Sequence, residues 1–156
     1  MNHEAFMQQA IDKAREGAKQ GNTPFGACIV KGGKVISCGH NQVWADTDIT
    51  AHAEVVTIRD ACRRLGTVDL SGTVLYSTCE PCPMCFSAIH WANISKIIFG
   101  ARIEDALGLG FNELVISNLQ MKKAGKSPVE VEGPFMLEEN LELFKYWDGL
   151  PGRKVY

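Results

Sequence analysis

The stretch from Thr73 to Ala101 constrains the fold of this chain more than any other. Two runs in it, "TVLYST" at 73–78 and "KIIFGA" at 96–101, are short, apolar and rich in β-branched or aromatic residues, which is typical of buried strands. The segment between them, "CPMCFSAIHWANI" at 82–94, has the length and composition of a helix. A strand, a helix and a second strand in this order predict two parallel strands joined by a helical crossover.

The rest of the chain predicts further helices and strands around this unit. Residues 3–20 carry apolar side chains at helical spacing, and Gly21 ends the run. The remaining expected elements are a hairpin over "FGACIVKGGKVISCGHN", a loop over "NQVWADTDI", a helix from about Ala51 to Leu65, a short strand in "VEVEGPF" and an amphipathic helix over "LEENLELFKYWDGL". With 156 residues, 46% of them hydrophobic, the chain suits one core. We therefore expect a single α/β domain over residues 1–156, with three layers and a mixed sheet.

Charge and hydropathy argue against several classes of function. The chain has 16 Lys and Arg against 18 Asp and Glu and no basic run, which disfavours nucleic acid as a partner. Its first residues mix charge with short apolar steps, unlike a signal peptide, and no apolar run is long enough to span a membrane. We expect a cytoplasmic protein without a membrane partner.

Six cysteines in a chain without a secretion signal indicate thiols or metal ligands rather than a disulfide framework. The disulfide that the sequence most readily suggests would join Cys28 and Cys38, which lie on the two strands of the expected hairpin. The turn is expected to pair Lys31 with Lys34. In that register Cys28 faces Ser37, and Cys38 points to the other side of the sheet. The register therefore predicts that both cysteines are free thiols packed in the core.

Two short motifs carry side chains that are costly to bury without a partner. "TAHAEVV" places His52 and Glu54 in a segment rich in Ala and Val, and "EPCPMC" supplies Cys82 and Cys85. His52 and the two cysteines are each expected in the first turn of a helix, where backbone N–H groups favour thiolates. One imidazole and two thiolates can then meet as three ligands of Zn²⁺. Three protein ligands leave the fourth tetrahedral position open to water, which is typical of a catalytic zinc site.

Glu54 is two residues from His52 and projects from another side of the helix, so it is not expected to bind the same metal. It can instead reach the water on that metal. Zinc lowers the pKa of bound water from about 15.7 to roughly 7, and a neighbouring carboxylate can pass the released proton to a leaving group. The motifs therefore predict a hydrolytic enzyme in which Glu54 is the proton shuttle.

Three simpler interpretations compete with this one. A CxxC motif can be redox-active, but that role leaves His52 and Glu54 unexplained. A structural zinc site needs a fourth ligand, and Cys79, three residues before Cys82, could supply it. His52 taken alone would more often be a core histidine than a ligand. The combination of both motifs favours the catalytic site.

The motifs "HAEV" and "EPCPMC" resemble the signature of the zinc-dependent cytidine deaminase superfamily. "TPFGACIVKGGKVISCGHN" is similar to the hairpin of this superfamily and "ISKIIFGAR" to the strand after its cysteine helix, so the resemblance covers almost the whole chain. It implies a three-layer α-β-α fold with a five-stranded mixed sheet, and hydrolytic removal of an amino group from a nucleobase. It also implies one zinc ion per chain, held by His52, Cys82 and Cys85, with Glu54 moving protons.

Within the superfamily the chain most resembles the bacterial guanine deaminases, in "NHEAFMQQAI", "AIHWAN", "GLGFNEL" and the aromatic end "KVY". This resemblance implies that Asn41 hydrogen-bonds the base, that Trp91 helps to enclose it and that Glu113 meets its amino edge. Guanine presents two donors, N1–H and the C2 amine, and one carboxylate can accept from both. Three more residues are expected around the base: Phe25, Ala53 and Tyr156.

The chain departs from the usual guanine deaminase pattern at two positions, with Glu113 where Asp is expected and His90 where Tyr is common. The alternatives are a tRNA adenosine deaminase, which shares the zinc motifs, and a cytosine deaminase. A tRNA enzyme is expected to have a basic C-terminal helix, whereas "LEENLELFKYWDGL" is acidic. A structural zinc-binding interaction domain is the alternative outside enzymes, but it would have no need of Glu54.

The C-terminal residues "PGRKVY" follow a Pro-Gly break and end on an aromatic ring. The simplest interpretation is a disordered polar C-terminus, because chain ends are usually disordered unless contacts with the fold hold them in place. The guanine deaminase resemblance instead implies a homodimer in which the segment from about residue 134 to 156 can be exchanged between subunits. Tyr156 would then cover an active site and exclude water from it.

Overall fold

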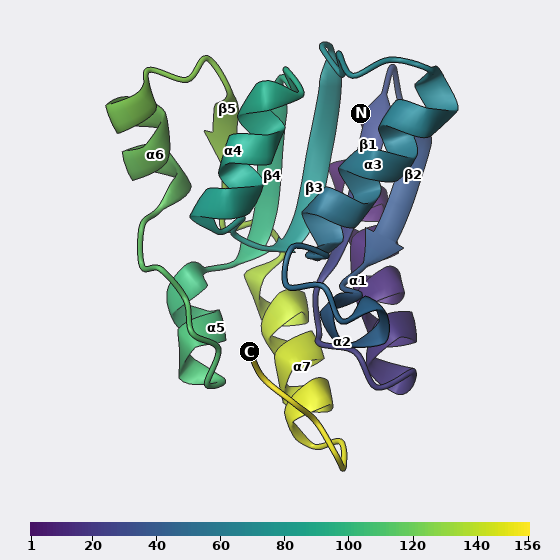
Figure 1. Ribbon diagram of the computed structural model, residues 1–156, viewed down its shortest axis with the longest axis vertical. Coiled ribbons are helices and arrows are strands. Elements are labelled where there is room, and N and C mark those ends of the chain that lie inside the picture. The colour runs from purple at the N-terminus through teal and green to yellow at the C-terminus, as the bar shows by residue number, and fades with distance from the viewer.

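The computed structural model describes the whole chain, residues 1–156. Five strands form one sheet, and helices cover both of its faces (Figure 1). The elements in chain order are α1 (His3–Lys19), β1 (Gly26–Lys31), β2 (Lys34–His40), α2 (Val43–Asp46), α3 (Ala53–Leu65), β3 (Thr73–Cys79), α4 (Pro83–Trp91), β4 (Lys96–Ala101), α5 (Ile103–Gly108), α6 (Asn118–Gly125), β5 (Glu130–Glu132) and α7 (Leu137–Asp148).

The sheet is mixed, with the strand order β2-β1-β3-β4-β5. β1 runs antiparallel to β2 and β3, whereas β3, β4 and β5 are parallel to one another. The predicted crossover is present as β3–α4–β4, and the expected five-stranded α/β sheet is confirmed. The carboxyl ends of β3 and β4 therefore meet at one edge, where α/β sheets commonly bind ligands.

Each face of the sheet buries its own apolar layer. α1 and α7 pack on one face against alternate strand residues such as Tyr76 and Ile98. α3 and α4 lie on the other face (Figure 1), where the intervening residues Leu75 and Ile97 are buried. The alternation follows from the two-residue period of a strand, and it gives the three layers that the sequence predicts.

The hairpin differs from the prediction in its register. Lys31 pairs with Lys34 as expected, but a β-bulge midway along the strands shifts the pairing beyond it. Cys28 therefore lies opposite Cys38, and the two form a disulfide with Cα atoms 4.1 Å apart. The prediction of two free core thiols is wrong, because one extra residue in a bulge moves every later side chain of that strand by one position.

Two predicted helices begin later than expected, and this determines where the ligand side chains lie. The helix expected from Ala51 begins at Ala53, and the one expected from Cys82 begins at Pro83. His52 and Cys82 are thus N-cap residues in extended conformation rather than first-turn residues. Pro83 occupies the first turn of α4, where its missing N–H is not needed.

Three short helices have no counterpart in the sequence prediction: α2, α5 and α6. α2 falls within the expected loop, and α5 and α6 lie between β4 and β5. Helices of four to eight residues are too short to show a full amphipathic period, so tertiary contacts decide whether they form. None of the helices is both long enough and apolar enough to cross a membrane.

Candidate active site

Three potential metal ligands meet at the N-termini of α3 and α4. The Sγ atoms of Cys82 and Cys85 each lie 3.6 Å from Nδ1 of His52, and the donor atoms of the group are within 4.8 Å of one another. With Zn–S bonds of about 2.3 Å and Zn–N bonds of about 2.0 Å, a tetrahedral zinc site separates sulfur from nitrogen by about 3.5 Å. The three donors are therefore spaced as zinc ligands are, and the set leaves one tetrahedral position for a small molecule.

The electrostatics of this group also suit a metal cation. A hydrogen bond with Cys85, assisted by His52, lowers the pKa of Cys82 to about 4 despite burial. The same hydrogen bond, together with burial, raises the pKa of Cys85 well above its usual value. Burial alone would lower the pKa of His52, but its hydrogen bond with Cys82 and the charge of Glu54 raise it. The fold thus stabilises a thiolate beside an imidazole, which are the ligand types that zinc prefers.

Glu54 lies beside the ligands on the first turn of α3. Its side chain is only 6% exposed, and Ser77 Oγ donates to Oε1 at 3.1 Å. Cys85 Sγ donates to Oε2 at 3.5 Å. Burial, together with the charge of Cys82, raises the pKa of Glu54. A buried carboxyl group beside the ligand cluster is positioned to accept and release a proton.

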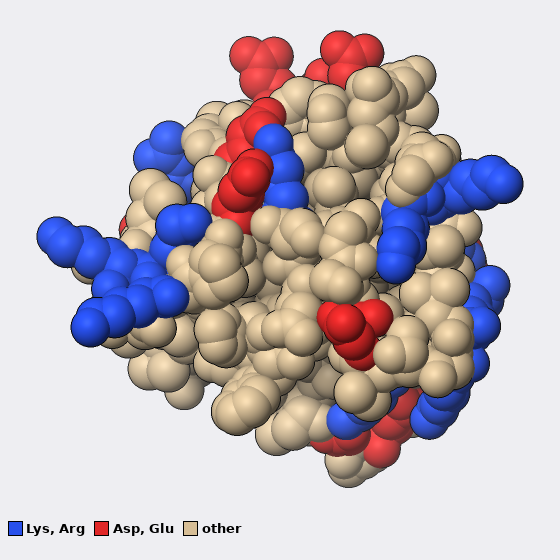
Figure 2. All heavy atoms as spheres, turned by 90° about the horizontal axis from the view of Figure 1, so that it is seen from above, with Lys and Arg blue, Asp and Glu red and all other residues tan.

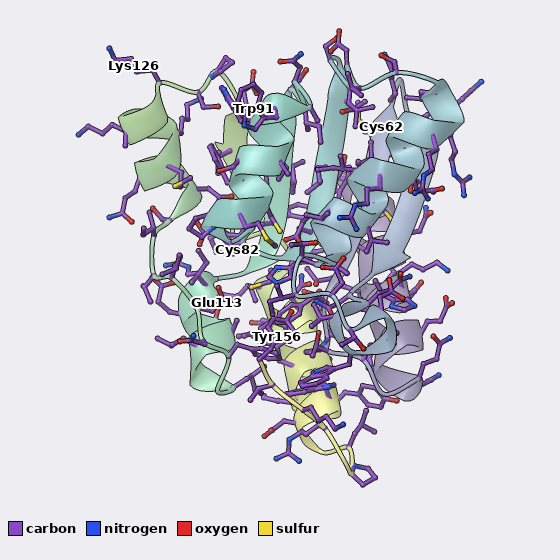
Figure 3. The ribbon with its side chains drawn as sticks, viewed as in Figure 1. Cys62, Cys82, Trp91, Glu113, Lys126 and Tyr156 are labelled. Atoms are coloured by element: carbon purple, nitrogen blue, oxygen red, sulfur yellow. A yellow bond between two sulfur atoms is a disulfide. The ribbon has the colours of Figure 1, made fainter.

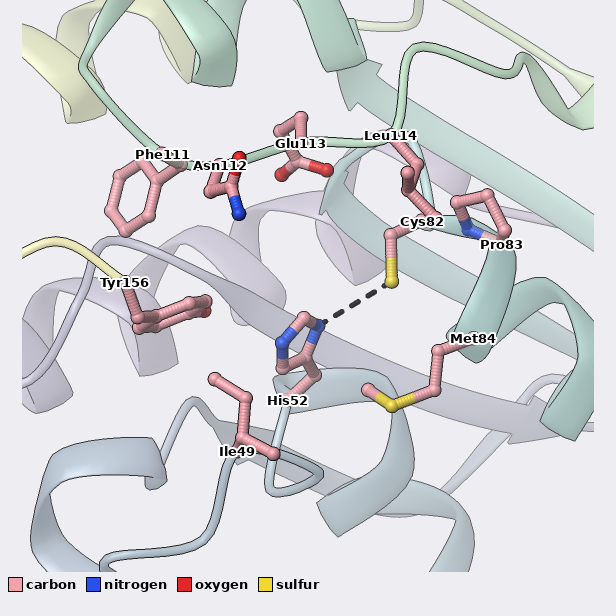
Figure 4. Close-up of a pocket in the computed structure, with 10 residues that line it drawn as sticks. All are labelled: Ile49, His52, Cys82, Pro83, Met84, Phe111, Asn112, Glu113, Leu114 and Tyr156. Carbon is pink, nitrogen blue, oxygen red and sulfur yellow. Dashed lines mark hydrogen bonds between the residues drawn. The ribbon is translucent and has the colours of Figure 1, made fainter.

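A cavity of about 240 Å³ opens beside His52 and Cys82 (Figure 4). A smaller hollow of about 20 Å³ adjoins it and is bordered by Asn41 and Glu54. Pockets for drug-sized ligands have volumes of about 300 to 1,000 Å³, so this cavity suits a smaller, single heterocycle.

Glu113 reaches the cavity from residues 111–117, a segment that is neither helix nor strand. Its side chain points into the pocket, between Tyr156 and Cys82 (Figures 3 and 4). Burial, with the negative charges of Cys82 and Glu54, raises the pKa of Glu113 to about 7, and no protein hydrogen bond contributes to that shift. The carboxyl group therefore remains available to pair with donors on a ligand.

The chain end closes the pocket. Asn41 Nδ2 donates to the hydroxyl of Tyr156 at 2.6 Å, and the backbone N of Asn112 donates to the main-chain O of Tyr156 at 2.9 Å. The ring of Tyr156 lies 5.3 Å from that of His52 and 5.2 Å from that of Phe111. Burial raises the pKa of Tyr156 far above its usual value, so the hydroxyl keeps its proton. The tail is thus tied into the pocket of its own chain rather than being a loose end.

Two other residues expected from the sequence lie next to the pocket. Phe25 borders the smaller hollow and packs against Phe111, with ring centroids 5.0 Å apart. Ala53 is fully buried as the first residue of α3, between His52 and Glu54. A role of either residue in binding a base stays a prediction.

The position of Trp91 differs from the prediction that this side chain helps to enclose the base. It is the last residue of α4, its side chain is 82% exposed, and it borders a separate groove together with His90 and Met121. The metal ligands lie at the opposite end of this helix, and a helix rises about 1.5 Å per residue, so Trp91 cannot reach the pocket of its own chain.

Several residues that line the pocket were not singled out from the sequence: Ile49, Pro83, Met84, Phe111, Asn112 and Leu114. Ile49 and Leu114 are exposed apolar residues, at 60% and 64%, and they flank the entrance between two segments far apart in the chain. In the sequence, only the position of these residues beside the charged motifs indicates that they line a pocket, and that signal is weak.

Cys79 does not complete a four-ligand site. Its Sγ donates to the carbonyl O of Arg102 at 3.5 Å, and it is not a member of the ligand group formed by His52, Cys82 and Cys85. The structural zinc interpretation therefore lacks its fourth ligand.

Comparison with protein families agrees with this geometry. Residues 1–101 match the family described as the cytidine and deoxycytidylate deaminase zinc-binding region. The matched range includes all three potential ligands and Glu54.

One relative extends the likeness to the full length of the chain. The chain is 42% identical over 160 residues to the guanine deaminase of Bacillus subtilis (strain 168), with 100% of both chains covered. It is 46% identical over 101 residues to the tRNA-specific adenosine deaminase of Aquifex aeolicus (strain VF5), over 65% of this chain and 67% of that one. A solved guanine deaminase from Nitrosomonas europaea matches with a TM-score of 0.88 and 25% identity, over 95% of this chain and 85% of that one. The ligand motif, the fold and the full-length relative show that this chain belongs to the cytidine and deoxycytidylate deaminase zinc-binding family.

Proposed function

We propose that this chain is a zinc-dependent guanine deaminase, which converts guanine and water to xanthine and ammonia. The observation that carries the proposal is Glu113, a half-buried carboxyl group that faces the ligand cluster and is free of protein donors. The N1–H and C2 amine of guanine are the complementary donors, and a carboxylate can accept from both. The full-length likeness to the guanine deaminase of Bacillus subtilis supports the same substrate.

We further propose that His52, Cys82 and Cys85 hold one zinc ion per chain, since their donor atoms have the separation and chemistry of zinc ligands. When bound, the metal would supply Lewis-acid activation of water at neutral pH. Glu54, held by Ser77, is placed to take a proton from the attacking water and to deliver it to the leaving amine.

The remaining residues bind the base and exclude water. Asn41 is oriented by two hydrogen bonds, one donated to Tyr156 and one accepted from the backbone N of Val43, so its amide has a fixed position beside the smaller hollow. Phe111 and Tyr156 form an aromatic wall over the pocket. A pocket closed in this way strengthens each electrostatic contact to the base.

A tRNA adenosine deaminase is the second candidate, because the relative from Aquifex aeolicus is 46% identical over the matched part. The first turn of α7 carries Glu138 and Glu139, which disfavours a phosphate backbone. On the face drawn in Figure 2, Lys and Arg side chains lie in separate groups with acidic ones between them. The acidic start of α7 favours a free base over a nucleic acid.

The test is a substrate panel with zinc-loaded protein. Guanine, guanosine, adenine, cytosine, cytidine and a tRNA anticodon stem are each supplied at equal concentration, and ammonia release is followed. We expect guanine to have the highest kcat/KM, with the Glu54→Gln variant as the control for contaminating activity. Faster release from the tRNA stem or from cytosine than from guanine would contradict the proposal.

A further inference from the structure

The segment that carries Glu113 is anchored at its two ends, and at its start Phe111 is only 2% exposed. Residues 111–117 form no helix or strand, and the backbone bonds within them, such as Glu113 N to Phe111 O at 2.9 Å, are local. Leu114, Val115 and Ile116 are 40% to 64% exposed, so apolar burial does not hold this part of the loop. At its start the loop is tied to the chain end through Asn112 N and Tyr156 O, 2.9 Å apart.

The other end of the loop is tied by Asn118, the first residue of α6. Its backbone N donates to Glu80 Oε1 at 2.8 Å, and its side-chain Nδ2 donates to the carbonyl O of Pro81 at 2.6 Å. Asn118 is fully buried, and Glu80 is 8% exposed. Both acceptors directly precede the ligand Cys82 in the chain, so this pair of bonds joins the loop of Glu113 to the segment that presents a metal ligand.

We propose that Asn118 is a positioning residue for substrate specificity: its two bonds to Glu80 and Pro81 fix the distance between Glu113 and the metal ligands. The inference rests on the proposed function, because it assigns to Glu113 the recognition of the base. It predicts that the side chain of Asn118 affects guanine binding without touching guanine.

The donor half of the amide carries this role. Asn118 Oδ1 is buried and has no hydrogen-bond partner, so the polar contribution of the side chain comes from the Nδ2 bond to Pro81. The bond between the backbone N and Glu80 persists in any variant at this position except proline. Substitution of Asn118 therefore removes the side-chain bond to Pro81 and keeps the backbone bond to Glu80. The loop can then shift while α6 stays attached.

Asn140 offers a matched control on the opposite side of the sheet. It is also fully buried, its Oδ1 is also without a partner, and its Nδ2 donates to the carbonyl O of Met136 at 2.7 Å. It lies in α7, away from the pocket. Asn118→Ala and Asn140→Ala thus each delete a buried amide of the same kind, and only the first deletion loosens the loop of Glu113.

The kinetic test uses zinc-loaded wild-type protein, both alanine variants, and Asn118→Ser as a second variant should Asn118→Ala fold poorly. The loss of one hydrogen bond predicts that KM for guanine rises about three- to tenfold in the Asn118 variants. The kcat for guanine should change less than about twofold, and KM in Asn140→Ala should stay at the wild-type value. A KM that rises equally in Asn118→Ala and Asn140→Ala would overturn the proposal.

A double-mutant cycle shows whether Asn118 acts through Glu113. In the Glu113→Gln background, Asn118→Ala should change KM for guanine by less than about twofold, because the recognition that it positions is already lost. Fully additive effects of the two substitutions would overturn the proposal.

Hydrogen exchange gives a readout that does not depend on activity. The amides of residues 112–116 should exchange faster in Asn118→Ala than in wild-type protein or Asn140→Ala, because their segment has lost a tie. Unchanged exchange there would overturn the proposal. If wild-type protein releases no ammonia from guanine, the proposed function fails, whereas the exchange measurement still decides whether Asn118 holds the loop.

Discussion

Glu54 and Glu113, two of the acidic side chains at the pocket, differ in how the fold holds them. Glu54 lies on a helix and accepts hydrogen bonds from Ser77 and Cys85, so its carboxylate has one orientation. Glu113 lies on an irregular segment, and burial rather than hydrogen bonding shifts its pKa. The first arrangement suits repeated proton transfer at one point, and the second suits recognition of donors on a ligand.

Glu54→Gln should retain zinc but lose most turnover. The amide keeps the shape of the side chain and an oxygen that can accept from Ser77, but it cannot carry the proton. General acid–base roles contribute about 10²- to 10⁴-fold, and kcat for guanine should fall by this factor. Metal analysis and steady-state assays on the same preparation check both parts. Near-normal turnover would remove Glu54 from the mechanism.

Glu113→Gln should lower kcat/KM for guanine while leaving the melting temperature near that of wild type. Hydrogen bonds to a charged group contribute about 1.5 to 3 kcal/mol, so the expected loss is roughly 10- to 100-fold. The fold should tolerate the change, because the carboxyl group has no protein donor to lose. Competition between guanine and adenine measures the effect on recognition. If the ratio of the two rates is unchanged, another residue recognises the donors.

At the scale of elements, α1 and β1 approach so closely that only glycine fits at position 26. A Cβ there would collide with the backbone O of Ala10 and lie 2.8 Å from the backbone N of Ala14. Both atoms belong to the backbone of α1 and cannot rotate away. Gly26→Ala should therefore lower the free energy of unfolding by about 1 to 3 kcal/mol, measured by urea unfolding of the zinc-loaded protein.

Gly125 provides the control for that substitution. It lies at the end of α6, and a Cβ added there meets no atom within 4 Å. Gly125→Ala should leave stability unchanged or raise it by up to about 1 kcal/mol, because alanine is the better helix former. Equal losses in the two variants would show that contact with α1 does not determine the effect at position 26.

At the scale of the whole molecule, the last residue of the chain completes the pocket. Tyr156 is more than a hundred positions from Asn41 and His52 in sequence. Tyr156 contacts Asn41, His52 and Phe111, whereas residues 151–155 are exposed. Deletion of residues 151–156 should reduce guanine deamination about tenfold or more through entry of water. Zinc content and melting temperature should stay nearly unchanged. Full activity in the truncated protein would show that the tail has no role in the site.

The expected homodimer with exchanged C-terminal segments stays a prediction, since the structure places Tyr156 in the pocket of its own chain. Mixed dimers can test it. Chains that lack residues 151–156 keep Glu54, and Glu54→Gln chains keep the tail. Exchange predicts that unfolding and refolding the two together restores guanine deamination above the level of either alone. If activity is not restored in dimers shown to contain both kinds of chain, each C-terminal segment belongs to the pocket of its own chain.

The sequence by itself determined the order of the main elements, the mixed sheet and the grouping of His52, Glu54 and the two cysteines. The element order follows from periodicity within each segment, the parallel pair from the strand–helix–strand order, and the grouping from the chemistry of two short motifs. The register of the hairpin, which joins Cys28 to Cys38, was decided only in the tertiary structure, because a single bulge reverses the facing of later residues.

The same holds for the surroundings of the ligand group. Trp91 lies at the wrong end of α4 to reach the pocket of its own chain, although the resemblance to guanine deaminases implies that it helps to enclose the base. Asn118 binds residues nearly forty positions earlier, and Tyr156 binds Asn41 across more than a hundred. Contacts of this range depend on how helices and loops pack on the sheet. Periodicity within one segment carries no information about such packing, so only the folded chain fixes them.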